Sequence, residues 1–151
     1  MTQQLPYSSL TLNEALVAFR SENDLATKYD GMRKEAQIHF ERHDIVHVLF
    51  GLDTSIRQEA QADGWTIFGT DISFQHIREF FSLPEEKELI DEIGWWEITK
   101  AYFRGVPDYL RIALQSRKLR KKWRWSDYSS YRDRQVDKIR DEFGIKDALA
   151  H

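Results

Sequence analysis

Apolar residues recur three and four positions apart along most of the chain, and they do not alternate with polar residues over the length of a strand. This spacing is the period of an amphipathic α-helix. The first predicted helix follows Thr11 and Glu14, a capping-box pair, and ends before Asp30 and Gly31. A second helix is predicted from about residue 32 to 50, where Gly51 is suited to stop it.

The same signals predict further helices in the rest of the chain. A third helix is expected after residue 54, and a short fourth has an apolar side made of Phe74, Ile77, Phe80 and Phe81. Pro84 suits the first turn of a fifth helix that continues to residue 96, and Gly105 with Pro107 indicates the start of a sixth. The last helix should end at Gly144, after an apolar face of Tyr128, Tyr131, Val136, Ile139 and Phe143. The pattern predicts an all-α fold, a single-domain bundle of about six or seven helices over residues 1–151.

The composition is typical of a folded domain, because 41% of the residues are hydrophobic and 13% are aromatic. No apolar run approaches the roughly 18 residues that cross a bilayer, and the N-terminal MTQQLPYSS lacks the basic and apolar parts of an export signal. We therefore expect a cytoplasmic protein. A net charge of −3 disfavours a nucleic-acid partner. The absence of cysteine leaves histidine, carboxylate and water as the available metal ligands.

The stretch HDIVHVLFGLDTSIRQE, residues 43–59, contains the candidate chemistry. Each helical residue turns about 100°, so His47 lies about 40° from His43 and Asp44 about 100° from it, within one arc. Apolar residues fill the remaining directions, which predicts a buried helix. A buried carboxylate is strongly disfavoured unless it pairs with a cation or binds a metal ion. The three polar residues are therefore candidate metal ligands.

Glu59 is the fourth candidate ligand. The predicted turn at Gly51 returns the next helix in the antiparallel direction, so that Glu59 should lie about level with His47. Two imidazoles and two carboxylates suit zinc, iron(II) or manganese better than calcium or magnesium, which prefer oxygen ligands alone.

Three other interpretations of this stretch remain open. Without a metal, Asp44 could pair with Arg42, Arg57 or His47. Zinc peptidases with the HExxH motif also space two histidines four apart, but Asp44 is one methylene shorter than their catalytic glutamate. HD-type metal-dependent phosphohydrolases share the HD pair, but they require a separate upstream histidine. Only His39, one turn earlier, precedes His43, and it is expected beside the site or in solvent.

The full set of His43, Asp44, His47 and Glu59 resembles the hallmark of the coenzyme Q biosynthesis protein four family, which is HDxxH followed by eleven residues and a glutamate. The stretch from YFRGVPDYL to RDEFGI also resembles the closing segment of that family, so the resemblance spans about residues 25–146. It implies an all-helical fold and a metal, usually zinc, held by those four residues. Family members usually carry more chain before the motif than the 42 residues found here.

The resemblance also implies a role in ubiquinone biosynthesis. The expected activity is a metal-dependent lyase reaction that removes the C1 carboxylate of a polyprenylated benzoate, together with organisation of other pathway enzymes. The implied partners are this substrate or a prenyl lipid, other quinone-biosynthesis enzymes, the inner face of the membrane and a second copy of the chain. A non-catalytic scaffold or prenyl-lipid carrier, whose metal only fixes the helix pair, is a different class of function that stays open. An open coordination position facing a pocket would favour the enzyme.

A basic and aromatic run, RKLRKKWRW, occupies residues 117–125. A solvated helix end is one interpretation, because cations stabilise the C-termini of helices. Contact with a membrane or lipid head groups is a second, because basic residues attract anionic lipid and tryptophan prefers the interface. Nucleic-acid binding is a third and fits least well, since the run is short and the chain is acidic overall. The residues assigned to the membrane interpretation are Arg117, Lys118, Arg120, Lys121, Lys122, Trp123, Arg124 and Trp125.

Overall fold

The computed structural model describes residues 4–82 and 84–150, apart from the side chains at positions 80, 81, 85, 86, 89, 90, 98, 101 and 102. Within these ranges the chain is helical, and its only β-type pairings are two isolated bridges. The prediction of an all-α fold is confirmed. The helices are α1 (Leu12–Glu22), α2 (Lys34–Phe50), α3 (Ile56–Gly69), α4 (Phe74–Phe81), α5 (Pro84–Ile93), α6 (Trp95–Gln115), α7 (Val136–Phe143) and α8 (Ile145–Leu149), with short 3₁₀ turns η1 (Ser116–Lys118) and η2 (Ser129–Tyr131).

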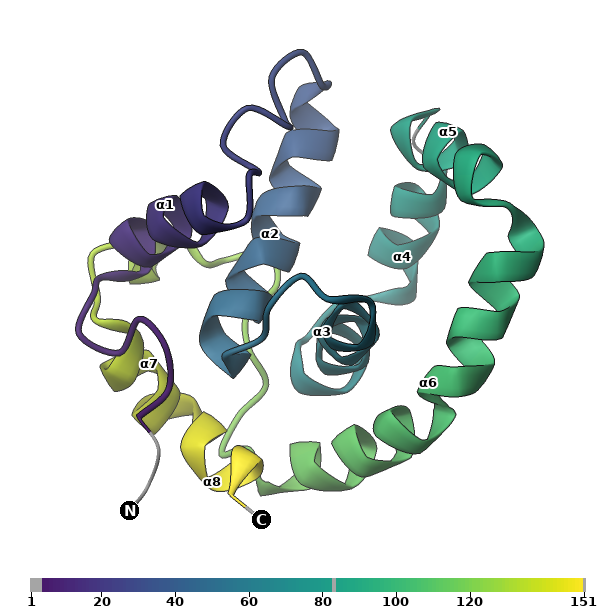
Figure 1. Ribbon diagram of the computed structural model, residues 1–151. Coiled ribbons are helices and arrows are strands. Elements are labelled where there is room, and N and C mark those ends of the chain that lie inside the picture. The colour runs from purple at the N-terminus through teal and green to yellow at the C-terminus, as the bar shows by residue number, and fades with distance from the viewer. Residues whose placement is uncertain (1–3, 83, 151) are drawn as a thin grey trace.

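Helix α3 lies at the centre of the molecule, with α2 on one side and α6 curving around the other (Figure 1). Helix α1 packs on α2, and α7 and α8 close the core against the C-terminal end of α2. The core consists of apolar side chains from α1, α2, α3, α6, α7, α8 and the segment that follows α6. This arrangement places α2, which carries the two candidate histidines, between α1 and α3.

The capping box of the first helix and the glycine stop of the second are confirmed, but the first helix ends at Glu22, well before the predicted end at Asp30 and Gly31. The Oγ1 atom of Thr11 accepts from the backbone N–H of Glu14 at 3.3 Å, and Glu14 Oε2 accepts from the backbone N–H of Thr11 at 2.8 Å. Gly51, at a φ of 68°, ends α2 in the left-handed conformation that glycine adopts most readily. Residues 44–50 are all buried, as the apolar pattern of this helix predicts.

The predicted boundary between the fifth and sixth helices is wrong. Helix α5 ends before Gly94, whose φ of 86° lies in the left-handed region, and α6 then runs unbroken through Gly105 and Pro107. Proline lacks an N–H and can bend a helix without ending it. Gly105 fits the helix interior because a Cβ atom there would come within 3.1 Å of the Tyr109 ring. Both residues therefore lie inside a curved helix.

The predicted last helix is too long at its N-terminal end. Helix α7 begins at Val136, whereas Tyr128 and Tyr131 lie at the short turn η2. Their rings still reach the core, because Tyr131 contacts Phe143 with ring centroids 5.5 Å apart. Gly144, at a φ of 72°, ends α7 as predicted, although α8 follows it directly.

The two tryptophans of the basic run belong to the core. Trp123 and Trp125 are each 1% exposed, and the cations at positions 120, 121, 122 and 124 point to solvent. The run is extended here and pairs with the end of α3: the N–H of Trp123 donates to Gly69 O at 2.8 Å and the N–H of Trp125 to Asp71 Oδ1 at 2.7 Å. Alternate side chains of an extended segment point to opposite sides. The expected contact of these two rings with a membrane surface does not fit their burial.

Helix α6 exposes an apolar face on the side away from α3. The exposed residues of this face are Trp95, Trp96, Phe103, Val106, Leu110 and Leu114. Ile112 lies on the opposite side of the helix, where it is 1% exposed and packs close to Gly64 of α3. Phe74 of α4 is also exposed, while the side chains of Phe80 and Phe81 lie outside the described residues. None of the helices in the described ranges is long and apolar enough to cross a membrane.

Candidate metal centre

The turn between α2 and α3 sets the position of the candidate ligands. After Gly51, the Asp53 carboxylate accepts from the backbone N–H of Ser55 at 2.8 Å, and α3 begins one residue later. The following helix returns alongside α2 in the antiparallel direction. His47 near the end of α2 therefore faces Glu59 near the start of α3, and His43 faces Asp63 one turn further along.

His43, His47 and Glu59 form a group that could hold a metal ion. One candidate ligand atom from each of the three lies within 4.8 Å of those of the other two. His47 Nε2 is 3.4 Å from Glu59 Oε2, and the two imidazole rings have centroids 4.8 Å apart. The structure thus brings together three of the four ligands predicted from the sequence.

His47 is the buried anchor of this group. It is 1% exposed, and Phe19 of α1 stacks on its ring with centroids 5.3 Å apart. Its Nδ1 atom is buried and has no hydrogen-bond partner among the residues that the structure describes. A buried polar atom without a partner is costly, and this cost falls on the nitrogen other than Nε2, the atom that faces Glu59. The Glu59 side chain is 43% exposed, so the group extends from the core to the surface.

Asp44 has other partners in this structure and does not belong to the group. Its Oδ2 atom accepts from Arg20 Nε at 2.8 Å, and its Oδ1 atom accepts from the Tyr29 hydroxyl at 3.0 Å. Burial raises the pKa of Asp44, and the Arg20 and Tyr29 bonds offset part of that rise. The expected need for a cation is thus met by Arg20, which comes from α1. A metal-ligand role for Asp44 remains a prediction.

The electrostatic balance around the histidines favours bound cations. Burial alone lowers the pKa of His43, but the contact with Asp63 and the charges of Asp63, Glu59 and Asp44 outweigh it and raise the pKa. Burial has the opposite effect on a carboxyl and tends to raise the pKa of Glu59. The contact with His47 and the charge of His43 outweigh it and lower this pKa overall. Glu59 is therefore an ionised carboxylate at neutral pH and is suited to bind a divalent ion.

Asp63 is a site residue that the sequence analysis missed. Its Oδ1 atom lies 3.4 Å from His43 Nε2, and its side chain is 47% exposed. The available signal was its spacing, because Asp63 follows Glu59 by four residues on α3, as His47 follows His43 on α2. Side chains four apart share one helix face.

His39 lies one turn before His43 and outside the metal group, as expected. Its ring packs edge-on against Trp125, with centroids 5.3 Å apart. Burial is the main cause that lowers its pKa to about 3, and the nearby charges of His43 and Arg42 act in the same direction. His39 is therefore neutral at pH 7 and packs in the wall behind the site.

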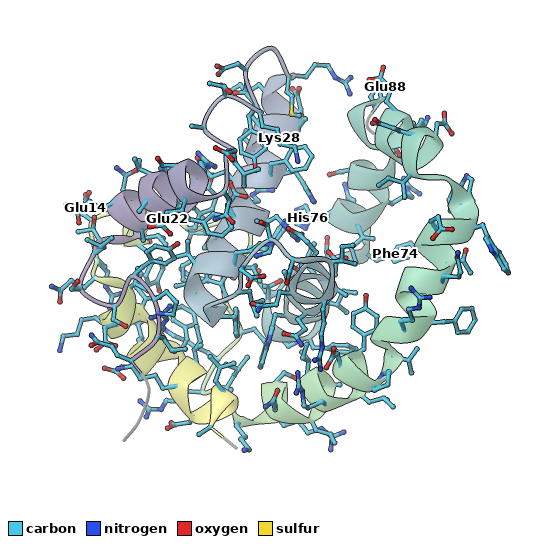
Figure 2. All side chains as sticks on the ribbon, in the orientation of Figure 1. Glu14, Glu22, Lys28, Phe74, His76 and Glu88 are labelled. Carbon is cyan, nitrogen blue, oxygen red and sulfur yellow. The ribbon has the colours of Figure 1, made fainter. Side chains whose placement is uncertain are left out.

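A cleft opens between the loop that precedes α2 and helix α5. Lys28 and Glu88 lie on its two sides (Figure 2), and Met32 and Pro84 also line it. The charge of Lys28 contributes to lowering the pKa of Glu59, so this lysine acts on the candidate metal group as well.

Acidic residues neutralise much of the basic run. Lys121 pairs with Glu142, while Lys118 Nζ donates to the backbone oxygen of Ala150 at 3.1 Å. Two further pairs join Arg120 to Asp147 at 3.2 Å and Arg124 to Asp127 at 2.8 Å. Three of the six cations are thus paired with carboxylates, and a fourth, Lys118, is bound to the backbone. Contact of the run with lipid head groups remains a prediction.

Comparisons of the chain with protein-family models, curated proteins and solved structures gave no match. The resemblance to the coenzyme Q biosynthesis protein four family therefore rests on the motif and the closing segment alone. Any function has to be argued from the site.

Proposed function

We propose that this protein is a metal-dependent enzyme of ubiquinone biosynthesis that removes the C1 carboxylate of a polyprenylated benzoate. The observation that carries the proposal is the convergence of His43, His47 and Glu59 on one spot between α2 and α3. Two imidazoles and a carboxylate suit zinc, iron(II) or manganese, and zinc is the ion that the family resemblance implies. The same resemblance supplies the reaction and the substrate class.

The position of Glu59 supports access of a substrate to the metal group. Glu59 reaches the surface, so an oxygen of a bound molecule can approach the group from solvent. Lys28 acts on the charge of Glu59 and lines a cleft whose other charged residues are Asp30, Glu88 and Glu92, so the cleft itself is acidic overall. A divalent ion held at this site would stabilise the negative charge that remains on the ring when carbon dioxide leaves.

The outer face of α6 supports the lipid-facing part of the proposal. Trp96, Phe103, Leu110 and Leu114 follow one another at spacings of seven and four, so they share one side of the helix, and all are exposed. Basic residues, Lys100, Arg104 and Arg111, run along one flank of this stripe. An exposed helix with an apolar face and one basic flank is suited to lie on an anionic membrane surface or against a prenyl chain.

The metal content of the purified protein tests this proposal. We expect roughly one transition-metal ion per chain, and loss of that ion when His43 or His47 is changed to alanine. His76→Ala is the matched control, because this histidine lies on α4 outside the group. Full retention of metal by both His43→Ala and His47→Ala would contradict the site.

A structural metal that only ties α2 to α3 is the second candidate function, and the deep burial of His47 favours it. Glu59→Gln separates the two. If the metal is structural, thermal stability and complementation of a quinone-deficient strain should fall together, because metal binding is then part of the folding free energy. If the metal is catalytic, the variant should stay folded and fail to complement. A stable variant that complements fully would contradict both candidates.

A further inference from the structure

We propose that the metal centre keeps a coordination position open for a carboxylate from solution, because Arg20 and Tyr29 withhold Asp44 from the ion. The three residues of the metal group are then the only ligands that the described part of the chain supplies. This inference rests on the metal site proposed above and adds the class of ligand that the site takes.

Both carboxylate oxygens of Asp44 are already bound. Oδ2 accepts from Arg20 Nε at 2.8 Å, Oδ1 accepts from the Tyr29 hydroxyl at 3.0 Å, and the residue is 3% exposed. A charge-assisted hydrogen bond is among the stronger ones in proteins, and a charge in the interior that loses its partner is strongly disfavoured. Asp44 would have to give up Arg20 to bind an ion.

Arg20 is itself held in place by further contacts. Its Nη2 atom lies 3.7 Å from Glu41 Oε2, and its guanidinium carbon lies 5.2 Å from the centre of the Tyr29 ring. A cation over an aromatic ring is attracted to it. Arg20 comes from α1 and Tyr29 from the loop before α2, whereas the two histidines of the metal group contact carboxylates of α3. Asp44 therefore has different neighbours from the metal group.

Three protein ligands leave room on the ion. A structural zinc ion has four protein ligands, while a catalytic one has three and an exchangeable fourth. Iron(II) held by two histidines and a carboxylate also keeps open positions. The side chains of His43 and Glu59 are 20% and 43% exposed, so solvent reaches the group from their side. An exchangeable ligand can arrive there without displacing the buried His47.

The charge of the site favours a carboxylate as this ligand. Two neutral imidazoles and one carboxylate leave a divalent ion with a single net positive charge, which a monoanion neutralises. If Asp44 were a fourth ligand, the centre would already be neutral and would attract an anion less. Asp63, the carboxylate next to His43, is half-exposed, so solvent weakens its repulsion of an anion. The open position thus suits the carboxylate of a benzoate.

The inference is tested with Co²⁺ as the probe in the unaltered protein, in Asp44→Asn, and in a double variant that combines Arg20→Met with Asp44→Leu. The double variant replaces the buried ion pair by apolar side chains, so it leaves no charge without a partner if Asp44→Asn is unstable. Glu59→Gln is the control for loss of a true ligand. Competition with a chromophoric chelator measures affinity, visible absorption reports coordination, and circular dichroism checks folding. Sodium benzoate and sodium azide are then titrated into each cobalt protein.

Both Asp44 variants should bind Co²⁺ within about threefold of the unaltered protein and keep its spectrum, whereas Glu59→Gln should lose at least about tenfold in affinity. Benzoate and azide should each change the cobalt spectrum of the unaltered protein and of both Asp44 variants, because the open position does not depend on Asp44.

Several outcomes would overturn the inference. A tenfold loss of affinity or a changed spectrum in either folded Asp44 variant would make Asp44 a ligand and leave the metal site in place. A cobalt spectrum that neither benzoate nor azide alters would show a closed set of ligands. A response to azide without one to benzoate would exclude the carboxylate. An unaltered protein that binds no cobalt would refute the metal site and the proposed function, and this inference with them.

Discussion

Gly144 lies where the backbone has little freedom to change. It joins α7 to α8 at a φ of 72°, and a Cβ atom there would lie 2.9 Å from the backbone nitrogen of Arg120. We expect Gly144→Ala to lower the free energy of unfolding by about 2–4 kcal/mol, from left-handed strain and from the close contact. Equilibrium urea unfolding measures the change.

Gly31 provides the matched control for this prediction. Its φ is 85°, but nothing lies within 4 Å of a Cβ atom built there. Gly31→Ala should therefore lose only the conformational part, about 1–2 kcal/mol. Equal losses in the two variants would show that the contact with Arg120 contributes nothing.

The cation that pairs with Asp44 could not be predicted from the sequence. The pattern of the second helix correctly predicts that Asp44 is buried, and elementary electrostatics requires a cation beside it. Which cation it meets depends on how α1 packs across α2, and Arg20 lies 24 residues earlier in the chain. Local spacing favoured Arg42 and Arg57, because a sequence shows neighbours along the chain and not across the core.

Arg140 links two helices by completing the end of α2. Its guanidinium is fully buried and donates to Leu49 O at 2.8 Å, Val48 O at 2.7 Å and Ser8 Oγ at 2.9 Å. The last carbonyls of a helix lack partners within the helix, and a cation there also interacts favourably with the helix dipole. Burial lowers the pKa of Arg140 to about 10, so it is charged at neutral pH.

Changing Arg140 to methionine should therefore cost about 3 kcal/mol of unfolding free energy, because it leaves buried acceptors without donors. Urea unfolding is the measurement, and Lys138→Met, at an exposed position of the same helix, is the control. A loss no larger than that of the control would show that water satisfies these carbonyls equally well.

Glu142 joins α7 to the segments on either side of it and should give stability a pH dependence. Its contact with Lys121 is the main cause that lowers its pKa, burial opposes this, and Arg134 adds to the lowering. A carboxyl whose pKa is lowered in the folded state stabilises the protein at pH values above its ordinary pKa of 4.5. This contribution is lost as the pH falls through the pKa of the folded state.

Glu142→Gln should accordingly destabilise the protein at pH 7 by less than about 1 kcal/mol, and the difference from the unaltered chain should vanish in acid. Thermal unfolding between pH 7 and pH 3 tests this, with Glu88→Gln on α5 as an exposed control. A difference between the two proteins that persists unchanged in acid would assign the loss to packing.

Helix boundaries could be predicted where a local capping or stop signal was not overridden by tertiary packing. The capping box at Thr11 and the glycine stop at Gly51 each decide a boundary within a few residues, and both are confirmed. The start of α6 was missed because Gly105 and Pro107 resemble a boundary, yet packing of α6 against α3 holds the helix together across them. The extended pairing of Trp123 with Gly69 has no local signature, because its partner is far away in sequence.

At the scale of the whole molecule, the apolar face of α6 and the basic run should contribute to membrane binding in different ways. Changing Phe103 and Leu110 together to serine should weaken binding to vesicles that contain anionic lipid, because both side chains are exposed. Changing Lys118 and Lys122 to glutamate, which spares the pair of Lys121 with Glu142, should weaken it through charge. Neither double variant should lose metal.

Vesicle co-sedimentation of the two double variants beside the unaltered protein measures both effects. Rising salt should weaken the contribution of the lysines more than that of the α6 face, since screening acts on charge. Binding that is unchanged in both variants would assign both regions to the solvent-exposed surface.

The position of Arg140 has a consequence for protein synthesis. All the candidate metal ligands have been added to the chain roughly 80 residues before Arg140, a delay of roughly 4–16 s at ordinary translation rates. Until then the end of α2 lacks the donors that hold its last carbonyls. The strand-like contacts of residues 132–136 with residues 10–13 are also missing at that stage. A nascent chain therefore carries every ligand while the helix that presents two of them still lacks its C-terminal donors, so stable metal loading should follow the synthesis of Arg140.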